Sequence, residues 1–340
     1  MMIGFRVDAN ETIATGHLMR CLAIAGELIK RGENVMFYLA ENKETGRLEE
    51  RNIPYRILHT DWREMEKELP EFKRELEKDR PDVLVVDSYQ ATARYLADME
   101  QIVPVLYVDD MAEEKYEVSF VLHYGDWLED NSYEERYSDV KTKVLAGMQY
   151  VPLRQEFYPA EAKADNALLL TPGGTDPYHM TRRVIEEMQK NGLLEKMDVH
   201  IVAGSMNPDI ALLRELEENE PRIHFYHNVN DMGNLMRQCC CAVSAGGTTL
   251  FELCACKIPV ICFSFADNQA DFTRRMGEHQ VMLYAGDARE NPQRTAERIV
   301  EQLDRLIRDR VLQEKLSGNM GRLVDGKGTA RIADALVSCL

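Results

Sequence analysis

Long apolar runs are absent from this sequence of 340 residues, because no stretch approaches the roughly 18 consecutive apolar residues of a membrane-spanning helix. The first ten residues, MMIGFRVDAN, also lack the apolar core of a signal peptide. Hydrophobic residues make up 45% of the chain and charged residues 29%, which is ordinary for a globular protein. These features predict a cytoplasmic protein without stable membrane insertion.

Positive charge is also scarce, and the formal net charge is −17. Surfaces that bind nucleic acid or anionic membranes need clustered lysine and arginine, so neither partner is expected. A small anionic ligand remains compatible with this charge, because backbone amides can bind it locally.

Several chemical motifs are missing as well. The eight cysteines form no C-x-x-C pair and most lie in apolar runs, which favours buried, reduced thiols. The histidines show no H-E-x-x-H spacing. The glycine turns match neither G-x-x-x-x-G-K-[ST] nor G-x-G-x-x-G, which disfavours ATP hydrolysis and ordinary NAD binding. We therefore expect no cofactor and no metal ion.

What the sequence does contain is an alternation of apolar strands and helical stretches. Apolar strands are predicted in the first half at 2–9, 35–40, 81–89 and 103–110, and in the second half at 167–174, 198–204, 222–229, 239–247 and 260–265. Gly16–Lys30 has helical spacing. The pattern predicts an α/β fold with two Rossmann-like domains, 1–150 and 151–340, the second with a helical tail. In such sheets ligands bind beyond the carboxyl ends of the strands, and two facing sheets would gather these ends around one cleft.

Two of these strand ends are glycine turns. SAGGTT leads from a strand into a helix, so Gly246, Gly247, Thr248 and Thr249 are candidates to bind a diphosphate through free amides. A tight turn with a threonine N-cap explains the same residues without a ligand. Glu252 follows in the first helical turn, where it could accept ribose hydroxyls or simply complement the helix dipole.

Another glycine turn is TPGGTDP, and it is one of several polar strand ends. Close approach of a ligand is favoured at Gly173 and Gly174, while Thr175 could bind it or cap the next helix. Other strand ends carry further polar candidates, which are Asp8, Tyr89, Asp267, Asn268 and Gln269. The last three could equally cap a helix.

His17 follows Gly16 at the start of the first predicted helix. The positive end of a helix opposes the imidazolium form, and a neutral imidazole can act as a general base on water or a hydroxyl. A capping or packing histidine is the alternative at this position.

The order of several blocks resembles that of the UDP-sugar hydrolases of pseudaminic acid synthesis, and related spore-coat polysaccharide proteins carry similar blocks. These blocks are RVDANETIATGHLMRCLAIA, VVDSY, VDD, GMQYVPLRQEF, GGTDP and SAGGTTLFEL…IPVICFSFADNQ. The resemblance spans about residues 3–275. SAGGTT…E and GGT alone are also similar to the glycosyltransferases that make lipid II.

The resemblance implies the GT-B architecture and hydrolysis of UDP-2,4-diacetamido-2,4,6-trideoxy-β-L-altrose to UDP and the free sugar. It implies that His17 activates the attacking water and that Tyr89 and Asn268 line the sugar site. The SAGGTT turn and Glu252 match the uridine-diphosphate site, and Asn228 and Val229 lie where such folds meet uracil. Ala14 stands where the family has a glycine, which adds a methyl group beside the expected sugar site. The alternatives are an inverting GT-B transferase that uses a UDP-sugar and a non-catalytic partner that binds one.

Overall fold

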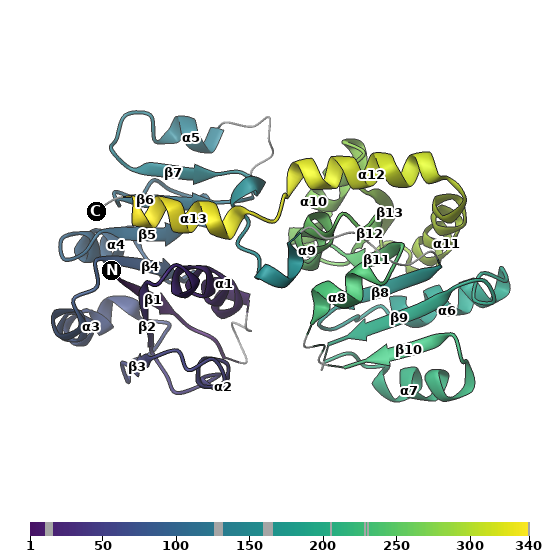
Figure 1. The fold of residues 1–340 in the computed structure, drawn as a ribbon, viewed down its shortest axis with the longest axis horizontal. Coiled ribbons are helices and arrows are strands. Elements are labelled where there is room, and N and C mark those ends of the chain that lie inside the picture. The colour runs from purple at the N-terminus through teal and green to yellow at the C-terminus, as the bar shows by residue number, and fades with distance from the viewer. Residues whose placement is uncertain are drawn as a thin grey trace. The chain divides into compact units, whose positions relative to one another are not determined.

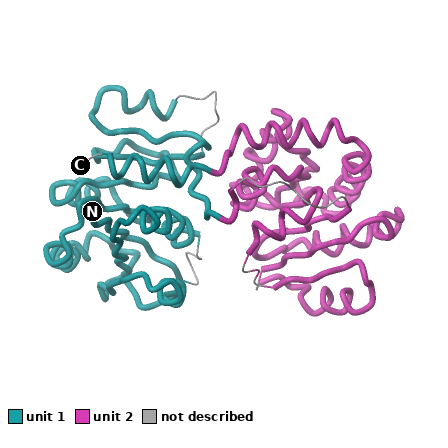
Figure 2. Tube along the Cα trace, in the orientation of Figure 1, with its two compact units in different colours: residues 1–155, 327–340 teal, residues 156–326 magenta. Residues whose placement is uncertain are grey.

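The computed structural model describes residues 1–10, 16–125, 132–158, 166–204, 206–227, 229 and 231–338. The chain folds into two compact units (Figure 2). Unit 1 comprises residues 1–155 and 327–340, and unit 2 comprises residues 156–326. The chain therefore passes between the units twice. None of the helices in the described part of the chain is long and apolar enough to cross a membrane.

Unit 1 is built on a parallel sheet of seven strands in the order β3-β2-β1-β4-β5-β6-β7 (Figure 1). The strands are β1 Met2–Val7, β2 Asn34–Leu39, β3 Tyr55–Ile57, β4 Val83–Asp87, β5 Val105–Val108, β6 Phe120–His123 and β7 Lys143–Ala146. The helices are α1 Gly16–Lys30, α2 Gly46–Glu49, α3 Met65–Asp79, α4 Ala93–Glu100, α5 Ser132–Arg136 and α13 Gly328–Val337, with the 3-10 turn η1 Met148–Tyr150. A second 3-10 turn, η2 Gln155–Phe157, spans the first boundary between the units.

The strand β4 shows why the sheet is covered on both faces, since all five of its residues are buried. Val85 packs in a cluster with α1 and α13, whereas Val86 packs in another with α3 and α4. A continuous apolar strand requires this arrangement, because its side chains alternate between the two faces.

The helix α13 corrects the predicted domain boundary. The sequence predicts the helical tail in the second domain, but Ile332 and Leu336 lie in the same core cluster as Leu18 of α1. Thr329 donates a hydrogen bond to the Leu153 carbonyl at 2.7 Å, which fixes the start of the helix on unit 1. The amphipathic pattern of α13 indicated that one side of the helix is buried, but not on which of the two sheets it packs.

Unit 2 contains a parallel sheet of six strands in the order β10-β9-β8-β11-β12-β13. The strands are β8 Ala167–Gly173, β9 Asp198–Ala203, β10 Ile223–Tyr226, β11 Cys241–Ala245, β12 Val260–Ser264 and β13 Leu283–Asp287. The helices are α6 Met180–Lys190, α7 Ile210–Asn219, α8 Met232–Arg237, α9 Thr249–Cys256, α10 Asp267–Glu278, α11 Pro292–Arg308 and α12 Arg310–Leu323.

Each sheet has one point where the strand order reverses direction. In unit 1 this point lies between β1 and β4, and in unit 2 it lies between β8 and β11. The connections leave these strand ends toward opposite sides, which opens a crevice where ligands bind in α/β proteins. The predicted class of two Rossmann-like α/β domains is confirmed.

Candidate functional site

His17 lies at the reversal point of unit 1, in the first turn of α1. Its side chain is largely buried, and Nδ1 lies 3.1 Å from Oδ1 of Asp87 at the end of β4. A carboxylate only accepts hydrogen bonds, so Asp87 favours the neutral tautomer with the hydrogen on Nδ1, in which the lone pair lies on Nε2. None of the described residues offers Nε2 a hydrogen-bond partner. This is the geometry of a histidine base oriented by a carboxylate.

Asp87 is held by Arg20, which follows His17 by one helical turn. The guanidinium donates from Nε to Oδ2 at 2.6 Å and from Nη2 to Oδ1 at 2.5 Å. Burial raises the pKa of Asp87, but the charge and hydrogen bonds of Arg20, together with His17 and Cys21, lower it by more, so the net pKa lies below its ordinary value. Asp87 is therefore ionised at neutral pH although it is fully buried.

Tyr89 covers the other side of His17. The two rings meet edge to face with their centroids 4.5 Å apart. The tyrosine hydroxyl donates to Asp110 at 3.2 Å, and burial together with that carboxylate raises the pKa of Tyr89. Because Tyr89 is 56% exposed, its ring can meet both His17 and a bound molecule.

A pocket of about 20 Å³ opens beside His17. It is lined by Asp8, His17, Trp62, Asp87, Ser88, Tyr89 and Gln90. One water molecule needs roughly 10–15 Å³ of such volume and two to four polar partners. The pocket therefore has the size and polarity to hold a single water next to the base.

Asp8 lines this pocket but is already engaged by the fold. Its Oδ2 accepts a hydrogen bond from Arg6 at 2.6 Å, and its Oδ1 accepts one from the Ala40 amide at 2.8 Å. Arg6 also forms a bidentate pair with Glu68, and both side chains are fully buried. Sequence reasoning missed this ion network, although an arginine inside the apolar strand MIGFRV was a visible signal. Asp8 thus lines the pocket with a carboxylate that the fold holds in place.

The first glycine turn of unit 2 follows β8. Gly173 has a φ of +93°, which favours glycine, and a Cβ on Gly204 would lie 2.5 Å from the Gly174 carbonyl oxygen. The turns after β8 and β9 are therefore in direct contact. Gly174 is exposed and Thr175 half-buried, whereas the buried Asp176 accepts the Met180 and Thr181 amides and starts α6.

The second glycine turn follows β11, the neighbour of β8. A Cβ on Gly246 would approach Thr273 Cγ2 to 2.6 Å, so this glycine allows α10 to pack closely. A Cβ on Gly247 would meet only open space. Thr248 occupies the N-cap position of α9 without a side-chain capping bond, so the threonine cap considered from the sequence does not form. Thr249 and Glu252 lie in the first turn of α9.

The ADNQ segment begins α10 at the end of β12, next to β11. Asn268 and Asp267 are exposed, and Asp267 pairs with Arg289. Gln269 is used by the fold, since its Oε1 accepts the Phe265 amide at 3.1 Å. Val229 is half-buried. The predictions for Asn228 and Ala14 fall outside the described residues.

The sheet topology thus brings the predicted residues together in two separate groups. Asp8, His17 and Tyr89 gather in unit 1, while the two glycine turns, Glu252 and Asn268 lie along the carboxyl edge of the unit 2 sheet. Sequence reasoning missed Arg20, whereas Asp110 lies at a strand end, YVDD, whose polar residues the sequence already marks as candidates. No group of three or more potential metal ligands occurs within the described residues. The seven described cysteines are free, and all but Cys240 are buried.

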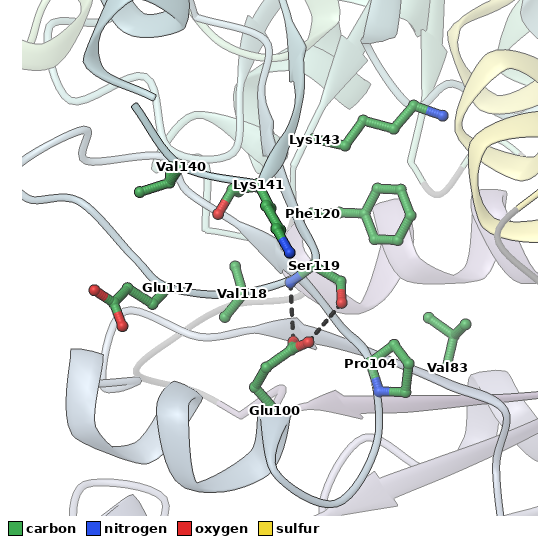
Figure 3. Close-up of a pocket in the computed structure, with 11 residues that line it drawn as sticks. Val83, Glu100, Pro104, Glu117, Val118, Ser119, Phe120, Val140, Lys141 and Lys143 are labelled. Carbon is green, nitrogen blue, oxygen red and sulfur yellow. Dashed lines mark hydrogen bonds between the residues drawn. The ribbon is translucent and has the colours of Figure 1, made fainter. Parts of the chain in front are cut away.

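A larger cavity, of about 630 Å³, lies at the opposite, amino-terminal edge of the unit 1 sheet (Figure 3). Its Glu100 carboxylate accepts hydrogen bonds from the Val105 amide and from the amide and hydroxyl of Ser119. That carboxylate therefore caps two strand starts. The lining of this cavity contains no histidine or cysteine, whereas the smaller pocket contains His17. We therefore choose the smaller pocket as the candidate site, although it has less volume.

Comparison with known proteins finds relatives in both groups of proteins that the sequence motifs resemble. The chain is 25% identical over 350 aligned positions to the spore coat polysaccharide biosynthesis protein SpsG of Bacillus subtilis, covering 99% of this chain and 98% of that protein. The chain is similar to both groups of proteins that its motifs resemble. The second group is represented by the bifunctional pseudaminic acid cytidylyltransferase and UDP-2,4-diacetamido-2,4,6-trideoxy-beta-L-altropyranose hydrolase of Helicobacter pylori. That match is 28% identical over 126 residues, 33% of this chain and 21% of the relative. No protein-family model matches.

Solved structures support the fold. Acinetobacter baumannii MurG aligns with a TM-score of 0.66 at 14% identity, covering 99% of this chain and 100% of that one. The calicheamicin glycosyltransferase CalG4 aligns with a TM-score of 0.68 at 15% identity over 99% and 97%. Anabaena HepE, solved with UDP-glucose, aligns with a TM-score of 0.59 at 15% identity over 99% and 100%. Identities this low support the GT-B fold alone.

Proposed function

We propose that the chain is an enzyme that acts on a nucleotide sugar and hydrolyses a UDP-activated diacetamido-trideoxy sugar to UDP and the free sugar. The observation that carries the proposal is the His17–Asp87–Arg20 arrangement beside a pocket of single-water size. The relative from Helicobacter pylori, whose name includes such a hydrolase, supplies the substrate class.

His17 is the general base in this proposal. The Nε2 lone pair takes a proton from water as the oxygen attacks the anomeric carbon, and the bond to the diphosphate breaks. The imidazolium that forms is stabilised by the ionised Asp87 3.1 Å away. General-base catalysis of this kind contributes about 10²–10⁴ in rate.

UDP is assigned to unit 2. Backbone amides of the turns at Gly173–Gly174 and Gly246–Gly247, with the start of α9, can bind a diphosphate and stabilise it as it leaves. The open space at Gly247 leaves room for phosphate oxygens to approach the backbone. We assign Glu252 to the ribose hydroxyls, Asn228 and Val229 to uracil, and Tyr89 of unit 1 and Asn268 of unit 2 each to the sugar.

Glycosyl transfer to a hydroxyl acceptor is the second candidate. The titles of solved structures with the same fold name glycosyltransferases, which favours it. Such a transferase would use the same base and nucleotide site. The pocket of about 20 Å³ beside His17 has room for one water or for one acceptor hydroxyl, so its size fits both candidates.

The test is incubation with UDP-activated diacetamido sugars in H₂¹⁸O without an acceptor. Hydrolysis predicts stoichiometric UDP and free sugar with ¹⁸O at the anomeric carbon. The variant His59→Asn changes an exposed histidine in the irregular segment after β3, whose positive φ of 58° asparagine tolerates, and it serves as the matched control that keeps the activity. UDP release that occurs only when a hydroxyl acceptor is added would replace hydrolysis with transfer.

A further inference from the structure

Arg20 lies in a closed ring of five side chains around the candidate base. The ring runs from His17 to Asp87, Arg20, Asp110 and Tyr89, and it closes where the Tyr89 ring contacts His17. Each member belongs to unit 1, so the ring is complete within one folded unit.

All three nitrogens of the Arg20 guanidinium are used inside this ring. Nε and Nη2 donate hydrogen bonds to the two carboxylate oxygens of Asp87. Nη1 donates to Asp110 at 2.8 Å and to the Tyr124 hydroxyl at 2.5 Å. The side chain is only 11% exposed. Arg20 is therefore fixed by its neighbours and does not present a free face to a substrate.

We propose that Arg20 is the positioning residue of the site: it fixes the carboxylate that orients His17 and, through Asp110, the tyrosine that packs on His17. The inference rests on the proposed role of His17 as the base. Arginine suits the task because its planar fork can bind two carboxylates at once in a fixed geometry, whereas lysine offers a single point charge.

The charges around Asp87 explain why its orientation depends on Arg20. Asp87 faces His17, Arg20 and the Cys21 thiol from α1, with Asp110, Tyr124 and Asp8 nearby. A protonated Asp87 would donate to Nδ1 of His17 and place the ring hydrogen on Nε2, which would abolish the base. Without Arg20, burial would dominate and the pKa of Asp87 would rise. Arg20 thus selects the tautomer of His17 indirectly.

The test compares Arg20→Lys and Arg20→Gln in the full chain. The matched control is Arg56→Gln, because Arg56 forms a similar bidentate pair with Asp79 elsewhere in unit 1. Since a small misplacement of reacting groups costs about 10²-fold, kcat should fall by about that factor in Arg20→Gln and by about 10-fold in Arg20→Lys, with KM little changed. The acid limb of the kcat profile should move to higher pH in Arg20→Gln, and the control should match the wild type.

A second readout needs no substrate. ¹⁵N NMR of the histidine side chains reports the tautomer of neutral His17, assigned by comparison with His17→Gln. The wild type and Arg56→Gln should carry the hydrogen on Nδ1, and Arg20→Gln should shift toward Nε2. A folded Arg20→Gln with an unchanged tautomer and pH profile overturns the inference. If Arg20→Gln does not fold, an unchanged tautomer in Arg20→Lys with full kcat overturns it. A wild type that hydrolyses no UDP-sugar would refute the proposed function instead, and the NMR result would still decide the role of Arg20.

Discussion

Replacing Asp87 by asparagine tests the site most directly, because each carboxylate oxygen has two donors around it. Oδ1 faces His17 Nδ1 and Arg20 Nη2, and Oδ2 faces Arg20 Nε and the Cys21 thiol. An amide nitrogen at either place meets an Arg20 N–H, so neither orientation of asparagine reproduces the native bonds. The variant also removes the charge that stabilises the His17 imidazolium.

The expected loss follows from these contacts. Removing the carboxylate that orients a histidine base costs up to about 10⁴ in kcat in the serine-protease triad. We expect a loss of about 10²–10⁴ here, which is about 3–5 kcal/mol of activation free energy at 1.36 kcal/mol per decade. UDP affinity should stay unchanged, because the glycine turns belong to unit 2.

Folding has to be measured in the same variant. Breaking a buried ion pair costs about 3–5 kcal/mol, and we take the lower end because Arg20 keeps Asp110 as a partner. Asp79→Asn, which breaks the bidentate pair of Arg56 and Asp79 elsewhere in unit 1, is the matched control for stability. The lowered pKa of Asp87 means that its stabilising effect is complete above the ordinary carboxyl pKa of about 4 and is lost as pH falls below it. The Asp87→Asn variant should lack this part of the acid dependence.

The assay is steady-state UDP release between pH 5 and 9, with thermal unfolding of each variant. A folded Asp87→Asn enzyme whose kcat lies within about threefold of the wild type would refute the orienting role of Asp87. Water activation would then have to come from another group.

Three further outcomes are expected. His17→Ala should lower kcat by about 10²–10⁴ while calorimetry shows unchanged UDP affinity, and near-normal turnover in a folded variant would remove His17 as the base. Gly247→Val should weaken UDP binding at least about tenfold, because the valine side chain would enter the open space beside the backbone amides. The control Gly318→Ala, also in open space but on α12 of unit 2, should leave UDP affinity unchanged. Equal UDP affinities of the two variants would show that the diphosphate binds at another place. Turnover should persist in EDTA, and a complete loss that Mg²⁺ restores would show that the site needs a metal.

The sequence predicted the strand ends well because strands buried on both faces of a parallel sheet are continuous apolar runs, and each run ends where polar residues begin. VLVVD ends at Asp87, where the structure has the partner of His17, and the predicted helix Gly16–Lys30 matches α1. Arg20 was missed because its spacing is that of any polar helical residue, and only the fold shows that it points at Asp87 and Asp110. The short strand β3, with three half-buried residues, gave no apolar run to detect.

The helix α13 also could not be assigned from the sequence. Its apolar face fits either sheet by periodicity, and the choice depends on contacts with Leu153 and α1, which lie about 170 to 310 residues earlier. Asp8 shows the same limit at the site. Its strand-end position predicts a ligand contact, which stays a prediction, but the sequence did not show that Arg6 and the Ala40 amide also bind its oxygens.

Unit 1 is formed by two separate segments of the chain, 1–155 and 327–340, and this constrains when its core can be completed during synthesis. Unit 2 is one continuous segment, 156–326, so all of its strands have been made before the last helix of unit 1 exists. Until residues 327–338 emerge, Leu18 and its neighbours on α1 lack the side chains of α13 that bury them. Domains that form in sequence on the ribosome usually complete from the N-terminus onward. Here the unit that carries His17 begins to be made before unit 2, but the core around α1 acquires the side chains of α13 only after unit 2 has been synthesised.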